Sequence, residues 1–137
     1  MVNIVTNTRV ALGNRSVIQQ IQIASDGSEE TDLVVYDSSA VAAALFPVRT
    51  DPLNCAIRRI MYSTSSKLAV VRIKWDATAD VLAWAMPAGG DGVFDFSSFG
   101  ALKNPAGTGS TGDILLTTTG LEAGDSISLI LEVDPGL

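Results

Sequence analysis

The stretch KLAVVRIKWDATADVLAWAMP, residues 67–87, carries the clearest structural signal in the chain. Its first half alternates, and we expect one face of a β-strand to carry the apolar residues Ala69, Val71, Ile73 and Trp75. Arg72 and Lys74 fall on the opposite face. The second half alternates large with small apolar residues, which predicts a strand with the large residues on one face and the small ones on the other, both faces being largely apolar. Its large residues are Leu82, Trp84 and Met86.

Strand signals continue on both sides of this stretch. NRSVIQQIQIAS (residues 14–25) alternates Ile with Gln, and TDLVVYD (residues 31–37) is a short β-branched and aromatic run. NCAIRRIMYST (residues 54–64) is expected to form a hairpin with residues 67–75, turning at residues 63–67. In DSISLILEV, the last strand, the residues expected to point inward are Ile127, Leu129, Leu131 and Val133.

One helix is expected near residues 38–45, where Asp37 or Ser38 can cap a short run of helix-forming residues that ends before Pro47. Short strands separated by Gly-, Asp- and Ser-rich turns predict an all-β fold. We expect an antiparallel β-sandwich, jelly-roll-like, with this one short helix. No repeat or linker divides the sequence, so residues 1–137 are expected to form a single domain.

The composition of the chain argues against several classes of function. The chain of 137 residues has a net charge of -6, no His and one Cys. Without His, the chain cannot form a Ser-His-Asp triad and lacks the usual ligand of a transition-metal site. The single cysteine, Cys55, is interpreted as a small buried hydrophobic residue. An acidic chain repels phosphate backbones, so we expect no nucleic-acid partner. No apolar run reaches the ~18 to 20 residues that cross a bilayer, and residues 1–15 lack the pattern of a secretory signal, so we expect neither a membrane nor secretion.

Residues 103–120, KNPAGTGSTGDILLTTTG, contain the glycine spacing of a phosphate-binding loop at Gly107 and Gly112. Such a loop needs Lys and then Ser or Thr after the second glycine, and a helix whose N-terminus faces the phosphate. Here Asp113 follows Gly112, and ILLTTT predicts a strand. We therefore expect a connector that feeds the penultimate strand and contacts a neighbouring subunit, and no nucleotide site.

Acidic residues raise two further candidate sites. Asp76, Thr78 and Asp80 alternate in a way that suits calcium, but an EF-type loop would need Gly and Glu where Val81 and Pro87 stand. A turn in which Asp76 and Asp80 cap backbone amides is the expected structure, and a surface cation is the alternative.

Glycosidase chemistry needs a carboxyl pair beside an aromatic platform. None of the loop acids stands out for this role: Asp91, Asp95, Asp113 and Glu122. We expect no enzyme, cofactor or small-molecule substrate.

Two features hint at a protein partner. In GVFDFSSFGALKNP (residues 92–105), three Phe residues either close one end of the sandwich or project into a neighbouring subunit, where aromatic residues are favoured. The basic residues of the two central segments can form a modest basic spot: Arg58, Arg59, Lys67, Arg72 and Lys74.

The pattern of residues 56–133 resembles a known family. The KWDATAD turn, DFSSFG, and TGDILLTTTG before a terminal strand are similar to small all-β proteins encoded among the head and neck genes of tailed bacteriophages, the capsid decoration or cement type in particular. The resemblance implies a virion protein that is assembled in the host cytoplasm and located on the capsid surface. It also implies many copies bound to the major capsid protein, self-association as a dimer or trimer, and no chemistry.

Residues 1–15 are apolar with weak periodicity, which predicts an N-terminal arm that packs on a partner. The expected partner-interface residues are Val2, Ile4, Val5, Arg58, Arg59, Arg72, Phe94, Phe96, Phe99 and Lys103. Two other functions stay open at this point. One is a neck or tail-tube protein of the virion, and the other is a carbohydrate-binding module that uses exposed Trp or Phe.

Overall fold

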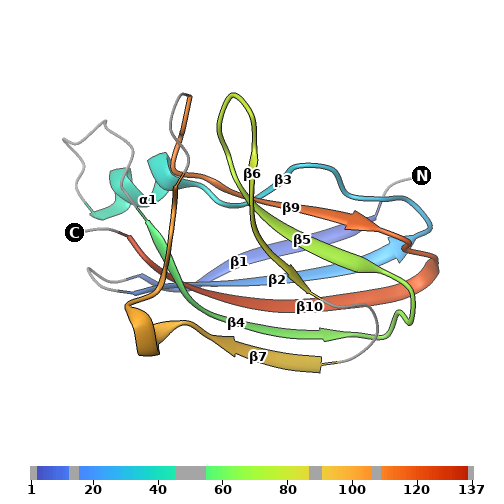
Figure 1. Cartoon of the computed structure of the whole chain (residues 1–137). Helices are drawn as coiled ribbons and strands as arrows, with labels where there is room; N and C mark the ends of the chain where they lie inside the picture. The colour runs from blue at the N-terminus through green and yellow to red at the C-terminus, as the bar shows by residue number, and fades with distance from the viewer. Residues whose placement is uncertain (1–2, 13–15, 46–54, 87–90, 106–108, 136–137) are drawn as a thin grey trace.

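The computed structural model describes residues 3–12, 16–45, 55–86, 91–105 and 109–135, which form two packed antiparallel β-sheets (Figure 1). Sheet A has the strand order β1 (Ile4–Leu12), β2 (Val17–Asp26), β10 (Ala123–Asp134), β4 (Ala56–Thr64) and β7 (Asp91–Asp95), and β8 (Leu102–Lys103) also pairs with β4. Sheet B has the order β3 (Leu33–Tyr36), β9 (Ile114–Thr119), β5 (Val70–Trp75) and β6 (Val81–Met86). The helices are α1 (Ser38–Leu45) and the 3-10 turn η1 (Ser97–Phe99). The predicted all-β sandwich with one short α-helix at residues 38–45 is confirmed.

Strand pairing in both sheets joins segments that are far apart in the sequence. β2 pairs with β10 and β3 pairs with β9, so early strands of the chain lie beside its last strands. When β1 and β8 are set aside, the two sheets have the orders β2-β10-β4-β7 and β3-β9-β5-β6. Two packed four-stranded antiparallel sheets with these strand orders form a jelly roll, as the sequence predicted. Neither helix in the described residues is long and apolar enough to cross a membrane.

The core lies between the sheets and is built by alternate residues of each strand. In β2, Ile21 and Ile23 are buried while Gln20 and Gln22 point outward, as expected. The inward sets predicted for β5 and β10 are also buried, and Trp75 is the largest of these side chains, at 1% exposure. Burial of this kind contributes about 25 cal/mol for each Å² of apolar surface removed from water.

The predicted hairpin between residues 54–64 and 67–75 is wrong. β4 lies in sheet A, between β10 and β7, whereas β5 lies in sheet B, between β9 and β6. The chain crosses from one sheet to the other through residues 65–69, where the Ser66 hydroxyl accepts hydrogen bonds from the amides of Leu68 (3.3 Å) and Ala69 (3.0 Å). Turn residues show where a chain changes direction, but not whether it returns to the same sheet, and here it does not.

β-bulges in β4 and β6 change which side chains of these two strands point inward. In β4, Ile57 pairs with Val133 and Arg59 with Glu132, so Arg58 is the extra residue. In β6, the pairing with β5 skips Ala83, so the side chains before and after Ala83 do not follow one continuous inward–outward alternation as predicted. Leu82 is 54% exposed while Met86 is fully buried. The extra residue in a bulge bends the strand and shifts its alternation by one position, so the predicted grouping of Leu82 with Met86 is wrong.

Candidate interaction surfaces

The loop that resembles a phosphate-binding loop has a structural role within the chain. Its second half is the strand β9, and the carboxylate of Asp113 accepts a hydrogen bond from the backbone amide of Ser38, at the first turn of α1 (2.8 Å). Asp37 caps the same helix by accepting from the amide of Ala40 (3.1 Å). The helix N-terminus that could attract an anion is thus occupied by the carboxylates of the chain. Gly107 lies outside the described residues.

The Asp-rich turn between β5 and β6 is held by hydrogen bonds. Asp80 accepts from the amide of Ala77 (3.2 Å), as predicted, whereas the Asp76 carboxylate accepts from the Thr111 hydroxyl (2.7 Å) in the loop before β9. The Thr111 amide also donates to the Asp76 carbonyl (3.3 Å), so this loop contacts its own chain. Within the described ranges, no group of three or more His, Cys, Asp or Glu side chains is placed to hold a metal ion.

Cys55 is a buried free thiol, as predicted. Its side chain is 3% exposed and its sulfur donates to the carbonyl of Gly112 (3.2 Å). Burial raises the pKa of this thiol to about 12, so the reactive thiolate is almost absent at neutral pH. A buried, protonated thiol of this kind packs as a small apolar side chain.

Aromatic residues of β6 and β7, and the aromatic residue that follows β7, pack together where one edge of sheet B meets one edge of sheet A. The ring of Trp84 lies 5.4 Å from that of Phe94 and 5.0 Å from that of Phe96, in tilted and edge-on arrangements. Phe96 is 4% exposed, and Phe94 is half-buried against the core. These rings therefore close one side of the sandwich. The Phe99 side chain lies outside the described part of the chain.

The predicted basic spot is wrong in its composition, because β4 and β5 belong to opposite sheets. Arg59 points out of sheet A, whereas Arg72 points out of sheet B and donates to the Thr119 hydroxyl (3.1 Å). Arg58 and Arg59 are each paired with an acid of β10. The Arg58–Asp134 and Arg59–Glu132 distances are 2.8 and 2.9 Å. Exposed pairs of this kind stabilise a fold by about 0–1 kcal/mol, and here they leave little free positive charge.

The remaining predicted interface residues lie apart from one another. Ile4 and Val5 are in the edge strand β1, which pairs with β2 in the chain's own sheet. Ile4 is 72% exposed, and Val5 is half-buried against the core. Lys103 is exposed in β8, which pairs with β4 and so lies away from the β1 edge of sheet A. Val2 lies outside the described residues. Contact of residues 1–15 with a partner stays a prediction.

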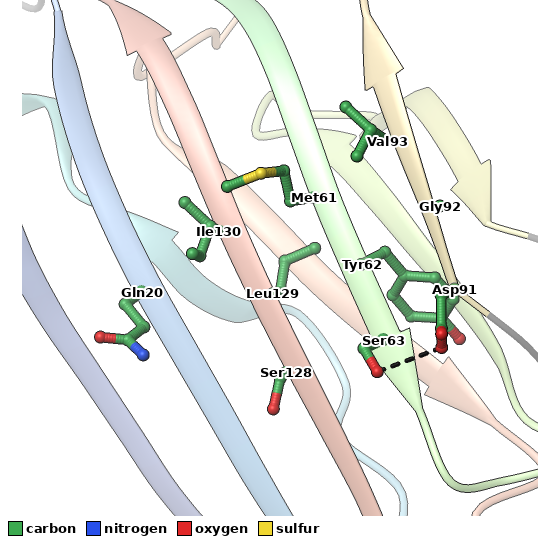
Figure 2. Close-up of a pocket in the computed structure, with 10 residues that line it drawn as sticks. All are labelled: Gln20, Met61, Tyr62, Ser63, Asp91, Gly92, Val93, Ser128, Leu129 and Ile130. Carbon is green, nitrogen blue, oxygen red and sulfur yellow. Dashed lines mark hydrogen bonds between the residues drawn. The ribbon is translucent and has the colours of Figure 1, made fainter.

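The outer face of sheet A carries apolar side chains where solvent-facing polar residues would be expected. We call the following residues the sheet A strip: Ile18, Met61, Val93 and Ile130. Ile130 pairs with Met61, and Met61 pairs with Val93, so three of the four lie in one row across β10, β4 and β7. Val93 is 62% exposed, and the other three are half-buried. Figure 2 shows Met61, Val93 and Ile130 on neighbouring strands. Apolar side chains gathered in this way mark a contact surface more often than scattered ones do.

Polar residues flank the row of Ile130, Met61 and Val93 in the sheet A strip on both sides. On one side, Arg59 lies opposite Asp95 on β7 and opposite Glu132 on β10. On the other side, Ser63 lies opposite Asp91 and donates to its carboxylate (3.2 Å), as Figure 2 shows. An apolar centre with a polar border is the usual composition of a protein–protein interface.

An open hollow of about 450 Å³ lies over this row. Its lining comes from β2, β10, β4 and β7, and Figure 2 shows Met61 and Ile130 side by side in it. The outward residues of the lining are Gln20, Met61, Ser63, Asp91, Val93, Ser128 and Ile130. Asp91 is the one charged side chain among them, and Met61, Val93 and Ile130 make the centre of the hollow apolar.

Sequence reasoning missed the sheet A strip, although one signal was present. On β10 the outward residues Ser126, Ser128 and Glu132 are polar, and Ile130 is the apolar exception among them. Met61 could not be assigned to the outer face, because the bulge at Arg58 shifts the alternation of β4.

A scan of the chain against protein-family models gives no match, and neither does a search of curated protein sequences.

Proposed function

We propose that this chain is a structural virion protein, a capsid decoration or cement protein that binds the lattice of the major capsid protein and stabilises the head. The observation that carries the proposal is the sheet A strip with its polar border. It is the feature of the described residues best suited to burying surface against another protein. The resemblance of residues 56–133 to phage head and neck proteins supplies the kind of partner.

The sheet A strip can act without any chemistry. A standard interface removes about 1,600 Å² from water, and its energy comes from a few well-packed apolar or aromatic side chains inside a polar border. Met61 suits such a place because its flexible thioether adapts to an irregular partner surface. Many copies on a shell add their contacts together, which is how a small protein can strengthen a large lattice.

The jelly-roll fold is compatible with this role and also with another one. Jelly rolls occur in viral capsid proteins and in lectins, and a fold by itself does not assign a function. A carbohydrate-binding module would need an aromatic platform on its surface. Trp75 is 1% exposed, and Trp84 packs against Phe94 and Phe96, which favours the virion protein over the module. A neck or tail-tube protein remains the nearer alternative, and self-association as a dimer or trimer stays a prediction.

The test compares two apolar-to-charged substitutions that are matched in exposure. Val93→Asp places a charge in the sheet A strip, on the edge strand β7. Leu82→Asp places one on the edge strand β6 of sheet B. The two native side chains are 62% and 54% exposed, so neither variant should unfold the protein. Each is mixed with virus particles that lack this protein, and the bound fraction is measured by sedimentation.

We expect Val93→Asp to lower occupancy at least about tenfold, the effect of losing ~1.4 kcal/mol of binding energy. Leu82→Asp should bind as the unsubstituted protein does. Equal occupancy of the two variants would reject the sheet A strip as the binding surface. Failure of the unsubstituted protein to bind any particle would reject the proposed function itself.

A further inference from the structure

The strand β7 is an edge of sheet A. It pairs with β4 on one side, and Figure 1 shows it as the outermost strand of the sheet. No other described strand pairs with its outer side. An edge strand presents backbone amides and carbonyls that can pair with an added strand, so natural proteins either protect such edges or use them for binding.

The two faces of β7 differ sharply. Gly92 and Phe94 point inward, and the Phe94 ring lies over Gly92, where an added Cβ would meet it at 3.3 Å. Asp91, Val93 and Asp95 are exposed and alternate along the outer face. The outer face therefore shows an apolar side chain between two carboxylates, and Val93 continues the row of the sheet A strip.

Neither carboxylate of β7 is taken up by an ion pair among the described residues. Asp91 accepts from the Ser63 hydroxyl. Asp95 accepts from the amide of Ser97 (2.8 Å) and from its hydroxyl. These hydrogen bonds, with a smaller contribution from Arg59, lower the pKa of Asp95, so it stays charged at neutral pH. Charged groups at this edge are thus available to a partner.

The carboxylates decide which kind of strand β7 can accept. A second copy pairing antiparallel to β7, with its Val93 at the centre, would place Asp91 opposite Asp95 twice. Like charges directly opposite each other destabilise a strand pair, whereas opposite charges stabilise it. The same two residues that disfavour pairing with a second copy would favour a partner with basic residues at the matching positions.

We propose that β7 binds an extended segment of a partner protein in which an apolar side chain lies between two basic ones at alternate positions. The added strand would extend sheet A and place its basic side chains beside Asp91 and Asp95. Its apolar side chain would lie beside Val93 and lengthen the sheet A strip. This inference rests on the proposed function as a binding protein, and it specifies the chemistry of the partner. The other edge of sheet A, β1, has Arg9 as its one charged residue and specifies no such partner.

Two synthetic heptapeptides test the charge preference with the full chain in solution. TKTVTKT carries the basic–apolar–basic pattern on one face of a strand, and TETVTET is its acidic counterpart. Each is titrated into the ¹⁵N-labelled protein at low salt, and amide chemical shifts are followed by NMR. We expect TKTVTKT to bind at least about tenfold more tightly than TETVTET, with shifts centred on residues 91–95.

The double variant Asp91→Lys/Asp95→Lys should reverse the preference and bind TETVTET more tightly. The control Glu122→Lys, in the turn before β10, also makes an exposed acid basic and should leave the preference unchanged. Equal binding of the two peptides, shifts centred elsewhere, or no shifts at millimolar peptide would overturn the inference. Because no particle is present, peptide binding can succeed where binding to capsids fails, and the two proposals are tested separately.

Discussion

Replacement of Phe96 by Ala tests whether this ring closes the sandwich or projects into a neighbouring subunit, the two roles that the sequence allowed. Phe96 is 4% exposed and lies edge-on to Trp84 at 5.0 Å, so its ring is part of the closed side of the sandwich. Truncating a buried Phe to Ala costs about 3–5 kcal/mol, of which an aromatic pair accounts for ~0.5–1.5 kcal/mol. That loss is a large share of the about 5–15 kcal/mol that stabilises a typical domain.

The assay is urea unfolding followed by tryptophan fluorescence. With a denaturant slope of about 1.5–2 kcal/mol per M, a loss of 3–4 kcal/mol lowers the midpoint by ~2 M. Val93→Ala on the neighbouring strand face is the matched control, and it should change stability by less than about 0.5 kcal/mol because Val93 is 62% exposed. A midpoint for Phe96→Ala within ~0.5 M of the unsubstituted protein would refute a closing role for this ring.

Three further predictions concern local structure. Gly120 and Gly124 both have φ +91, but a Cβ at Gly120 would lie 3.0 Å from the Leu68 carbonyl oxygen, and a Cβ at Gly124 would meet nothing within 4 Å. Gly124→Ala should therefore cost about 1–2 kcal/mol from backbone strain alone, and Gly120→Ala should cost more in the same urea assay. Burial, with smaller contributions from two neighbouring aspartates, raises the pKa of Asp113 in the folded protein, so its ionised form lowers stability at pH values above that pKa. Asp113→Asn should then be more stable than the unsubstituted protein at pH 7, with the gap closing as the pH falls toward 4, and a gap that widened on acidification would contradict this. Cys55 should resist alkylation by iodoacetamide at pH 7 and react after denaturation, because burial raises its pKa to about 12; rapid labelling of the native protein would show that the thiol is accessible.

Much of the fold follows from local sequence patterns. The strict alternation of residues 69–75 and 127–133 predicted inward faces that the structure confirms, and α1 begins and ends where its cap and its run of Ala predicted. Asp113 was taken as evidence against a phosphate site, and in the structure its carboxylate accepts a hydrogen bond from the amide of Ser38.

The features that the sequence could not predict depend on pairing between strands that are far apart along the chain. The turn at residues 65–69 connects two sheets, and no local signal distinguishes such a turn from a hairpin. The error carried over to the basic residues, because Arg59 and Arg72 were placed together although their sheets face opposite directions. The sheet A strip depends on the same information: Met61, Val93 and Ile130 become neighbours only through the register of β4 with β7 and β10.

The number of copies of this protein in purified virus particles decides whether it decorates the capsid, and quantitative mass spectrometry against the major capsid protein measures that number. A decoration protein bound across the shell should be present in hundreds of copies and should co-sediment with the particles. About a dozen copies would place the protein in a neck ring instead. Its absence from the particles would contradict the proposed function.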